Sequence, residues 1–188
     1  MPSQSQGTEG KRLVIGIAGR IGAGKTSAAK YLSAQHGFQY LRYSQVLAEW
    51  HGIDPENKAE LRRVGRAVMA SGLQPELNRR LIPQILPGLD AAVDGLRHPM
   101  DQESLSDEFS HSFRLIYIEC GVEQRWRHVS GKGSYANRDV LIAADSDPVE
   151  RQIESLKTGA DLVFTNEGSL AVLYAAIDEV IPSFRKED

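Results

Sequence analysis

Residues 19–26 have the sequence Gly-Arg-Ile-Gly-Ala-Gly-Lys-Thr, which fits the spacing G-x-x-x-x-G-K-[ST]. Glycines at this spacing let backbone N–H groups curve around phosphate oxygens, and a helix that begins at the end of the loop adds partial positive charge. Lys25 can reach the β- and γ-phosphates, and the Thr26 hydroxyl can bind Mg²⁺. An apolar run at 13–18 precedes the loop and a helical pattern up to His36 follows it, which is the context that the motif requires. The segment therefore predicts a nucleoside triphosphate site formed by Gly19, Gly22, Ala23, Gly24, Lys25, Thr26 and Ser27.

The composition excludes several classes of partner. The 188 residues are 41% hydrophobic and 25% charged, which suits one globular domain with a substantial core. A net charge of −3 and a pI of about 6.0 give no global basic field for nucleic acid or an anionic membrane. No apolar run reaches transmembrane length, no signal peptide is visible, and the single cysteine, Cys120, suits a reducing compartment as a packed residue. We therefore expect a cytoplasmic protein without nucleic-acid or membrane partners, with a disordered leader at 1–12 and one domain at 13–188.

Apolar strand-like runs alternate with helical patterns along the chain. The expected strands are 13–18, 38–43, 89–93, 113–120 and 160–165. Helical patterns are expected at 26–36, 44–51, 54–71, 75–86 (interrupted at Pro83), 122–130, 147–158 and 169–180. Such alternation implies an α/β fold, in which a parallel sheet carries helices on both faces. Ligands of these sheets collect at the carboxyl ends of the strands, where the phosphate loop, Asp94 and Asn166 are expected to converge.

Asp94 follows the third expected strand, and Arg97 comes three residues later in the sequence Asp-Gly-Leu-Arg. A carboxylate at this place can hold Mg²⁺ through water or orient the attacking group. A guanidinium can bind a phosphate through two parallel hydrogen bonds. An Asp before Gly is also common in ordinary turns, but the Gly and Arg that follow favour a functional role. We therefore predict that Asp94 is a metal ligand and that Asp94 and Arg97 are catalytic.

With these residues identified, the chain resembles the nucleoside monophosphate kinases. Within them it is most similar to the small P-loop kinases that include deoxynucleoside monophosphate kinases and dephospho-CoA-kinase-like proteins. The matching segments are 19–26, 44–47, 94–97, 147–150 and 160–170, in the order of that branch. The resemblance implies a three-layer P-loop NTPase fold with a five-stranded parallel sheet. It also implies an acceptor-binding segment at about 44–88, a lid at about 125–147, and ATP and Mg²⁺ as cofactors.

The resemblance assigns roles to single residues as well. Ser44 and Leu47 match the start of the acceptor-binding helix, and Asn166 and Gly168 match the loop around the donor base. The arginines of the acceptor segment that would meet the monophosphate, together with Arg97, are Arg62, Arg63 and Arg66.

Lid residues in such kinases neutralise charge on the transferring phosphoryl group. The candidates at about 125–147 are Arg125, Arg127, Lys132 and Arg138. Arg125 is favoured because it lies on the helix leading into the lid, and Arg138 because it lies in the lid itself.

The leading interpretation is ATP- and Mg²⁺-dependent phosphoryl transfer to a (deoxy)nucleoside monophosphate, by a monomer or homodimer that binds this small-molecule acceptor. A monophosphate is already an ionised nucleophile, so positioning and charge neutralisation can supply the rate without a strong general base. A dephospho-CoA-kinase-like enzyme is an alternative, but such kinases usually carry an acid after the second strand, where residues 43–45 are Tyr-Ser-Gln. A nucleotide-binding regulator without turnover is a further alternative, since Met69 stands about where related kinases often carry an arginine.

Overall fold

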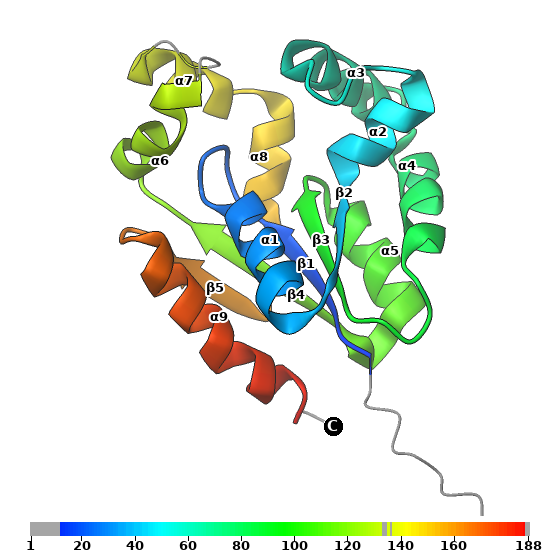
Figure 1. The fold of residues 1–188 in the computed structure, drawn as a ribbon. Coiled ribbons are helices and arrows are strands. Elements are labelled where there is room, and N and C mark those ends of the chain that lie inside the picture. The colour runs from blue at the N-terminus through cyan, green and yellow to red at the C-terminus, as the bar shows by residue number, and fades with distance from the viewer. Residues whose placement is uncertain (1–11, 133–134, 136, 187–188) are drawn as a thin grey trace, which may run out of the picture.

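The computed structural model describes residues 12–132, 135 and 137–186, in which the strands form one parallel sheet with helices on both faces (Figure 1). The strands are β1 (Val14–Ala18), β2 (Gln39–Arg42), β3 (Ala91–Leu96), β4 (Phe113–Glu119) and β5 (Leu162–Thr165). They lie in the order β2-β3-β1-β4-β5, and all paired neighbours are parallel. The predicted α/β fold with a five-stranded parallel sheet is therefore confirmed. Residues 1–11 of the predicted leader lie outside the described residues.

Alternate residues of the central strand β1 point to opposite faces of the sheet and join separate hydrophobic clusters. Ile15 and Ile17 pack with residues of α1 (Lys25–His36) and α9 (Leu170–Phe184). Val14 and Ala18 belong to the cluster on the other face. The helices that contribute to that second cluster are α2 (Tyr43–His51), α3 (Lys58–Ala70), α4 (Gln74–Leu81), α5 (Pro99–Phe109) and α8 (Pro148–Ser155).

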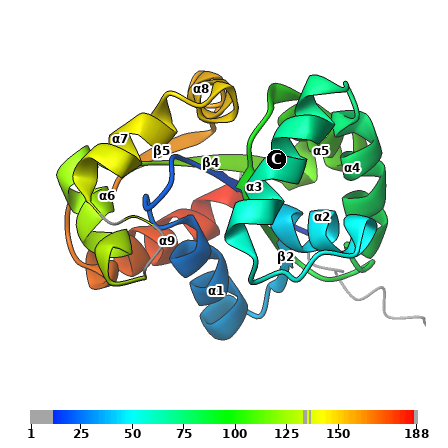
Figure 2. The same ribbon diagram turned by 90° about the horizontal axis from the view of Figure 1, so that it is seen from above.

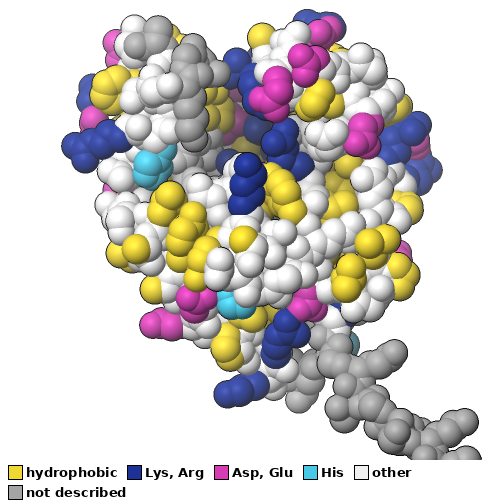
Figure 3. Space-filling model, viewed as in Figure 1, with side chains coloured by type: hydrophobic (Ala, Val, Ile, Leu, Met, Phe, Trp, Pro, Cys, Tyr) yellow, Lys and Arg dark blue, Asp and Glu magenta, His cyan; other side chains and the backbone are white. Residues whose placement is uncertain are grey.

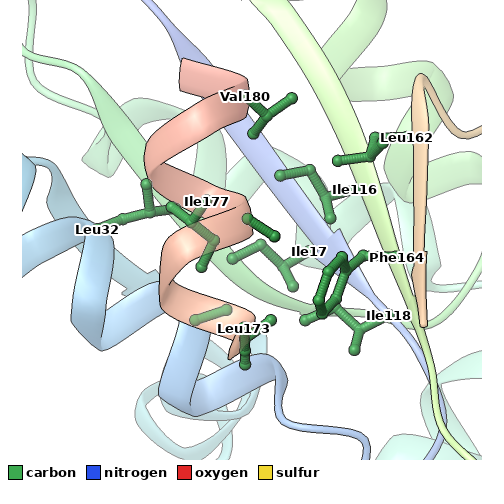
Figure 4. Close-up of a pocket in the computed structure, with 11 residues that line it drawn as sticks. Ile17, Leu32, Ile116, Ile118, Leu162, Phe164, Leu173, Ile177 and Val180 are labelled. Carbon is green, nitrogen blue, oxygen red and sulfur yellow. The ribbon is translucent and has the colours of Figure 1, made fainter. Parts of the chain in front are cut away.

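The layer between α9 and the sheet is closely packed. Figure 4 shows Leu173, Ile177 and Val180 of α9 directed toward Ile17 and Phe164 of the strands. The cavity left among these side chains is only about 10 Å³, close to the smallest space that holds one water molecule. The strand that leads into the phosphate loop is therefore held by a filled apolar layer.

Two groups of helices rise above the carboxyl edge of the sheet, and the loop after β1 lies between them (Figures 1 and 2). One group contains α2 and α3, with α4 lower down beside α5, and the other contains α6 (Val122–Val129), α7 (Arg138–Asp145) and α8. The surface is hollowed between the two groups, and Lys and Arg side chains gather there (Figure 3). No helix in the described ranges is long and apolar enough to cross a bilayer.

Several elements differ from the sequence prediction. Helices α5 and α7 lie in segments for which the sequence predicts none. Helix α5 buries only Asp101 and Leu105, so it lacks a clear apolar periodicity, and α7 buries only Leu141. The helix predicted from residue 54 begins at Lys58, because the Asn57 side chain accepts the N–H of Glu60 as its N-cap. The predicted interruption at Pro83 is confirmed, since α4 ends at Leu81 and a short 3-10 helix, η1 (Ile82–Gln84), follows.

The turn between β3 and α5 is organised by Asp101, whose side chain is fully buried. Its Oδ2 accepts the backbone N–H groups of Arg97 at 2.9 Å and His98 at 3.0 Å, and its Oδ1 accepts Gln74 Nε2 at 2.6 Å. Desolvation outweighs these three bonds and raises the pKa of Asp101 above its ordinary value. The buried carboxylate therefore fixes the backbone from which the Arg97 side chain extends.

Replacing Asp101 by Asn turns one of its two acceptor oxygens into an amide N–H₂ donor, which in the present side-chain orientations faces the Gln74 Nε2 donor. We expect the Asp101→Asn variant to lose about 1–3 kcal/mol of unfolding free energy, the range for an unpaired buried polar group. Urea unfolding followed by circular dichroism measures this loss. The exposed Asp107 of α5 provides the control, Asp107→Asn, which should unfold like the unmodified protein; equal losses in both variants would contradict the assignment.

Candidate functional site

The phosphate loop approaches other parts of the chain so closely that glycine is required at several of its positions, among them Gly22 and Gly24. Gly22 has φ +80°, and a Cβ there would lie 2.7 Å from the carbonyl oxygen of Arg125. Gly24 has φ +110°, and a Cβ there would lie 2.8 Å from Asn166 Nδ2. Gly24 is also the N-cap of α1, so the loop ends where the helix presents its unpaired N–H groups. The loop therefore has the backbone geometry and the polarity of an anion site.

Asp94 connects the phosphate loop to the neighbouring strands. Its Oδ2 accepts hydrogen bonds from Thr26 Oγ1 at 2.7 Å and from Tyr40 Oη at 3.1 Å. Asp94 is buried within β3 and does not follow the strand as predicted, because β3 continues to Leu96, which pairs with Ala18. Thr26 and Asp94 are thus brought together as the sequence predicts, and both offer oxygen atoms that suit Mg²⁺.

Tyr40 is a site residue that the sequence analysis misses. It lies on β2 opposite Ala92, two residues before Asp94, so it shares a face of the sheet with Asp94. Desolvation and the nearby Asp94 carboxylate raise the Tyr40 pKa well above its ordinary value, so the hydroxyl remains a donor. The strand register, once known, would have identified it.

Lys25 lies against the loop, with Nζ donating to the carbonyl oxygen of Arg20 at 2.9 Å. Desolvation, followed by the positive charge of Arg97, lowers the Lys25 pKa to about 8, although Asp94 and Glu150 act in the opposite direction. These four charged side chains therefore lie within electrostatic reach of one another.

Three of the predicted acceptor arginines contact the segment that follows α6. Arg97 Nη1 donates to Glu150 Oε1 at 2.7 Å, and Arg66 Nη1 donates to Asp147 Oδ2 at 2.8 Å. Arg62 Nη1 donates to the hydroxyl of Tyr135 at 2.7 Å and lies 5.5 Å from the centre of its ring. Glu150, Asp147 and Tyr135 are further residues that the sequence analysis gives no role in the site.

Other predicted acceptor residues lie differently. The Ser44 hydroxyl accepts Arg42 Nε at 2.9 Å, whereas Leu47 is buried in the hydrophobic core. Arg63 is exposed and pairs with Glu60 at 3.3 Å on the same helix.

Two favoured lid arginines have contrasting surroundings. Arg125 is buried and binds Asp145 through both terminal nitrogens, at 2.9 and 2.5 Å, and it also donates to the carbonyl oxygen of Ile21 at 3.1 Å. Arg138, at the start of α7, forms an exposed ion pair with Glu123. Arg125 thus stabilises the phosphate loop through its hydrogen bond to Ile21, while Arg138 lies on the outer part of the predicted lid.

The predicted base-binding loop contacts the phosphate loop directly. Asn166 is buried, and its Nδ2 donates to the carbonyl oxygen of Ala23 at 2.9 Å. The carbonyl oxygen of Gly168 accepts Gln124 Nε2 at 3.3 Å, which joins this loop to α6. His128 of α6 also contacts the phosphate loop, with Nδ1 2.8 Å from the carbonyl oxygen of Gly22.

A polar cavity of about 260 Å³ lies beside the phosphate loop at the carboxyl end of β4. Its lining includes Arg20, which pairs with Glu154 at 3.0 Å and with Asp145 at 3.4 Å. Cys120 also lines it, and desolvation together with the Glu167 charge raises the thiol pKa to about 11. The thiol is therefore neutral at physiological pH, in keeping with its prediction as a packed residue.

The lowered Lys25 pKa generates a testable pH dependence. Only the ammonium form attracts phosphate, so nucleotide binding should raise the Lys25 pKa and take up a proton at pH values above about 8. We expect the affinity for ATP to be about tenfold weaker at pH 9 than at pH 7, because about one Lys25 in ten is then charged. Calorimetric titrations at both pH values measure this. The Lys25→Arg variant keeps its positive charge at pH 9, so its affinity for ATP should change much less between the two pH values. An equal change in affinity for the variant and the unmodified protein would contradict the prediction.

The contact between Tyr40 and Asp94 generates a second prediction. Tyr40→Phe removes one of two hydrogen bonds to Asp94 Oδ2, so the carboxylate should be held less firmly beside Thr26. We expect the Mg²⁺ concentration for half-maximal binding of a non-hydrolysable ATP analogue to rise roughly threefold to tenfold. Tyr31→Phe, which removes a hydroxyl that donates to Asp178 at 2.8 Å on the outer surface, is the control and should leave this concentration unchanged.

Comparisons with known proteins bear on the fold. No protein-family model matches the chain, and a search of curated proteins gives no match. Among solved structures, TT1252 from Thermus thermophilus is similar with a TM-score of 0.61 and 21% identity, over 92% of this chain and 97% of that one. Shikimate kinase from Acinetobacter baumannii, in complex with shikimate, gives a TM-score of 0.55 and 19% identity over 93% and 95% of the two chains. Shikimate kinase from Bacteroides thetaiotaomicron gives 0.58 and 12% over 90% and 98%. These likenesses show that the chain has the fold of P-loop kinases.

Proposed function

We propose that the protein transfers the γ-phosphoryl group of ATP to a small anionic acceptor, and that this acceptor is a (deoxy)nucleoside monophosphate. The observation that carries the proposal is the 2.7 Å hydrogen bond between Thr26 and Asp94, formed beside Lys25 at the start of α1. A hydroxyl, a carboxylate and an ammonium at the mouth of a glycine loop are the groups that phosphoryl transfer requires.

The oxygen atoms of Thr26 and Asp94 fit a magnesium site. Mg²⁺ is commonly held by one or two protein oxygens together with phosphate oxygens and water. Within the described residues, no group of three or more His, Cys, Asp and Glu side chains could hold a metal ion. Magnesium, when bound, would neutralise charge on the phosphates, and Lys25 would bind the same phosphates from the loop side.

The charges across the cleft favour an anionic acceptor. Arg97 and Arg66 face the segment after α6, and both guanidiniums carry N–H groups that can bind a phosphate monoester. Arg42 ends β2, and Tyr43 and Ser44 begin α2, so no acid stands at this junction to accept a proton from a hydroxyl. A monophosphate needs no such base, because its oxygen is already ionised.

The lid assignment remains part of the proposal. Arg138 lies at the exposed start of α7, where it pairs with Glu123, while Arg125 binds Asp145 and the phosphate loop. We assign the stabilisation of the phosphate loop to Arg125 and the approach to the transferring group to Arg138.

A hydroxyl acceptor is the second candidate function. It is favoured by the similarity to two shikimate kinases, one of them in complex with shikimate. Dephospho-CoA belongs to the same class of acceptor. The absence of a carboxylate among residues 42–45 weighs against this class.

The test incubates the protein with ATP, Mg²⁺ and one acceptor at a time, and follows ADP formation. The acceptors are the nucleoside and deoxynucleoside monophosphates, dephospho-CoA and shikimate. We expect turnover with one or more monophosphates and none with the two hydroxyl acceptors. Turnover only with dephospho-CoA or shikimate would replace the proposal with the second candidate. ATP binding without turnover of any acceptor would favour a nucleotide-binding regulator.

Lys25→Ala tests the site itself. We expect at least a hundredfold loss of turnover, the range for removing one group that stabilises developing charge. Lys30→Ala removes an exposed lysine of the same helix and should retain full activity. Retained activity in Lys25→Ala would contradict the assignment of the phosphate loop.

A further inference from the structure

The first turn of α8 carries two carboxylates, and each binds an arginine from the opposite side of the cleft. Asp147 is the N-cap residue of α8 and binds Arg66 of α3 at 2.8 Å. Glu150 lies three residues later and binds Arg97, which follows β3, at 2.7 Å. Residues three apart lie on the same face of a helix. The two arginines proposed to bind the acceptor are therefore held by one helical turn.

The two ion pairs differ in burial. The Arg66 side chain is 52% exposed and that of Asp147 is 21% exposed, so water can replace either partner. The Glu150 side chain is only 3% exposed, while that of Arg97 is 38% exposed. Exposed pairs are weak and exchange readily, whereas a buried carboxylate that loses its cation is strongly destabilised. The Arg66 pair can therefore open during binding, and the Arg97 pair cannot open without leaving a buried charge unpaired.

The two carboxylates use their oxygens differently. Asp147 Oδ1 accepts the backbone N–H of Val149 at 2.9 Å and caps the helix, which leaves Oδ2 for Arg66. Partial desolvation acts against ionisation of Asp147, but the hydrogen bond from Arg66, the cap and the nearby Arg97 charge hold its pKa below the ordinary value. Glu150 uses Oε1 for Arg97, and its buried Oε2 has no hydrogen-bond partner in the part of the chain that the structure describes.

We propose that Asp147 and Glu150 are positioning residues with opposite effects on the acceptor site. Asp147 occupies Arg66 in the place of the acceptor's anionic group and is displaced when that group binds. Glu150 stays bound to Arg97 and directs the remaining guanidinium N–H groups into the cleft. The inference rests on the proposed function in that the two arginines are taken to bind the acceptor's anion.

The substitutions can be chosen so that the fold is preserved. Asn is as good an N-cap as Asp, so Asp147→Asn keeps the hydrogen bond from the Val149 N–H. Its amide N–H₂ then faces Arg66, which has no acceptor atom, so the contact with Arg66 is lost. Glu150→Gln keeps an oxygen for Arg97, and its new amide replaces an oxygen that has no partner in the described chain. Glu103→Gln, on the exposed side of α5, removes the same charge elsewhere and is the control.

Inorganic phosphate is the probe, with the phosphate loop first saturated by Mg²⁺ and a non-hydrolysable ATP analogue. Calorimetry at millimolar phosphate measures the dissociation constant of each variant. We expect Asp147→Asn to bind phosphate about two to five times more tightly, because an exposed competing pair is removed. We expect Glu150→Gln to bind about ten times more weakly, because a charge-assisted hydrogen bond becomes a neutral one. Glu103→Gln should bind like the unmodified protein.

A double-variant cycle with Arg66→Gln separates displacement from general repulsion. The gain from Asp147→Asn should vanish in the Arg66→Gln background. A gain that persists there, an Asp147→Asn variant that binds no more tightly, or a folded Glu150→Gln variant with unchanged affinity would each overturn the inference. Failure of the unmodified protein to bind phosphate would also overturn it. Thermal unfolding of each variant establishes that it is folded.

The two proposals can fail separately. If the unmodified protein turns over no acceptor but the phosphate affinities shift in opposite directions, the proposed function fails and the positioning roles stand. If a monophosphate is turned over but the affinities do not shift, the positioning roles fail alone. With an active acceptor, Asp147→Asn should lower its KM at similar kcat, and Glu150→Gln should lower kcat/KM.

Discussion

The hydrogen bond between Thr26 and Asp94 is the interaction on which the site depends, because it joins the phosphate loop to the strand beside it. It can form only if β1 and β3 are neighbours in their observed register, with Ile17 opposite Asp94. The apolar side chains of α1 and α9 hold β1 from one face, and the Arg125 and Asn166 contacts hold the loop from the sides. Packing therefore defines the position of the loop, and the loop in turn defines where a triphosphate and its metal can be bound.

The second constraint is the balance of charge around the cleft. Five of the arginines assigned to the acceptor or the lid have an anionic or polar partner on another element. The pairs are Arg62 with Tyr135, Arg66 with Asp147, Arg97 with Glu150, Arg125 with Asp145 and Arg138 with Glu123. This neutralisation explains how a chain with a net charge of −3 can concentrate cations at one site. It also means that an anionic ligand must compete with carboxylates of the protein, so the burial of each pair decides which contact can be exchanged.

The sequence predicts the sheet and the phosphate loop well, because both are encoded locally. Apolar runs between glycines mark the strands, and the spacing from Gly19 to Thr26 marks the loop. The roles of Tyr40 and Glu150 are not local. Tyr40 meets Asp94 only through the pairing of β2 with β3, and Glu150 meets Arg97 only through the packing of α8 against the cleft. Helix α5 escapes prediction because its buried positions include Asp101, an acid that hydrophobic periodicity does not count.

The strand order also constrains when the site can form during protein synthesis. Strand β1 lies between β3 and β4, and Val14 is paired with Ala91 on one side and Phe113 on the other. Both edges of β1 can therefore be hydrogen-bonded only after these later residues have been synthesised. The phosphate loop is made early, but the strand and helix contacts that shape it come from residues made much later. Pairings between distant parts of a chain form slowly, and exposed apolar strands favour aggregation in the meantime. A ribosome-bound fragment that ends before β4 would therefore carry the complete nucleotide motif on a strand with one unpaired edge, and its apolar β1 would favour aggregation until β4 emerged.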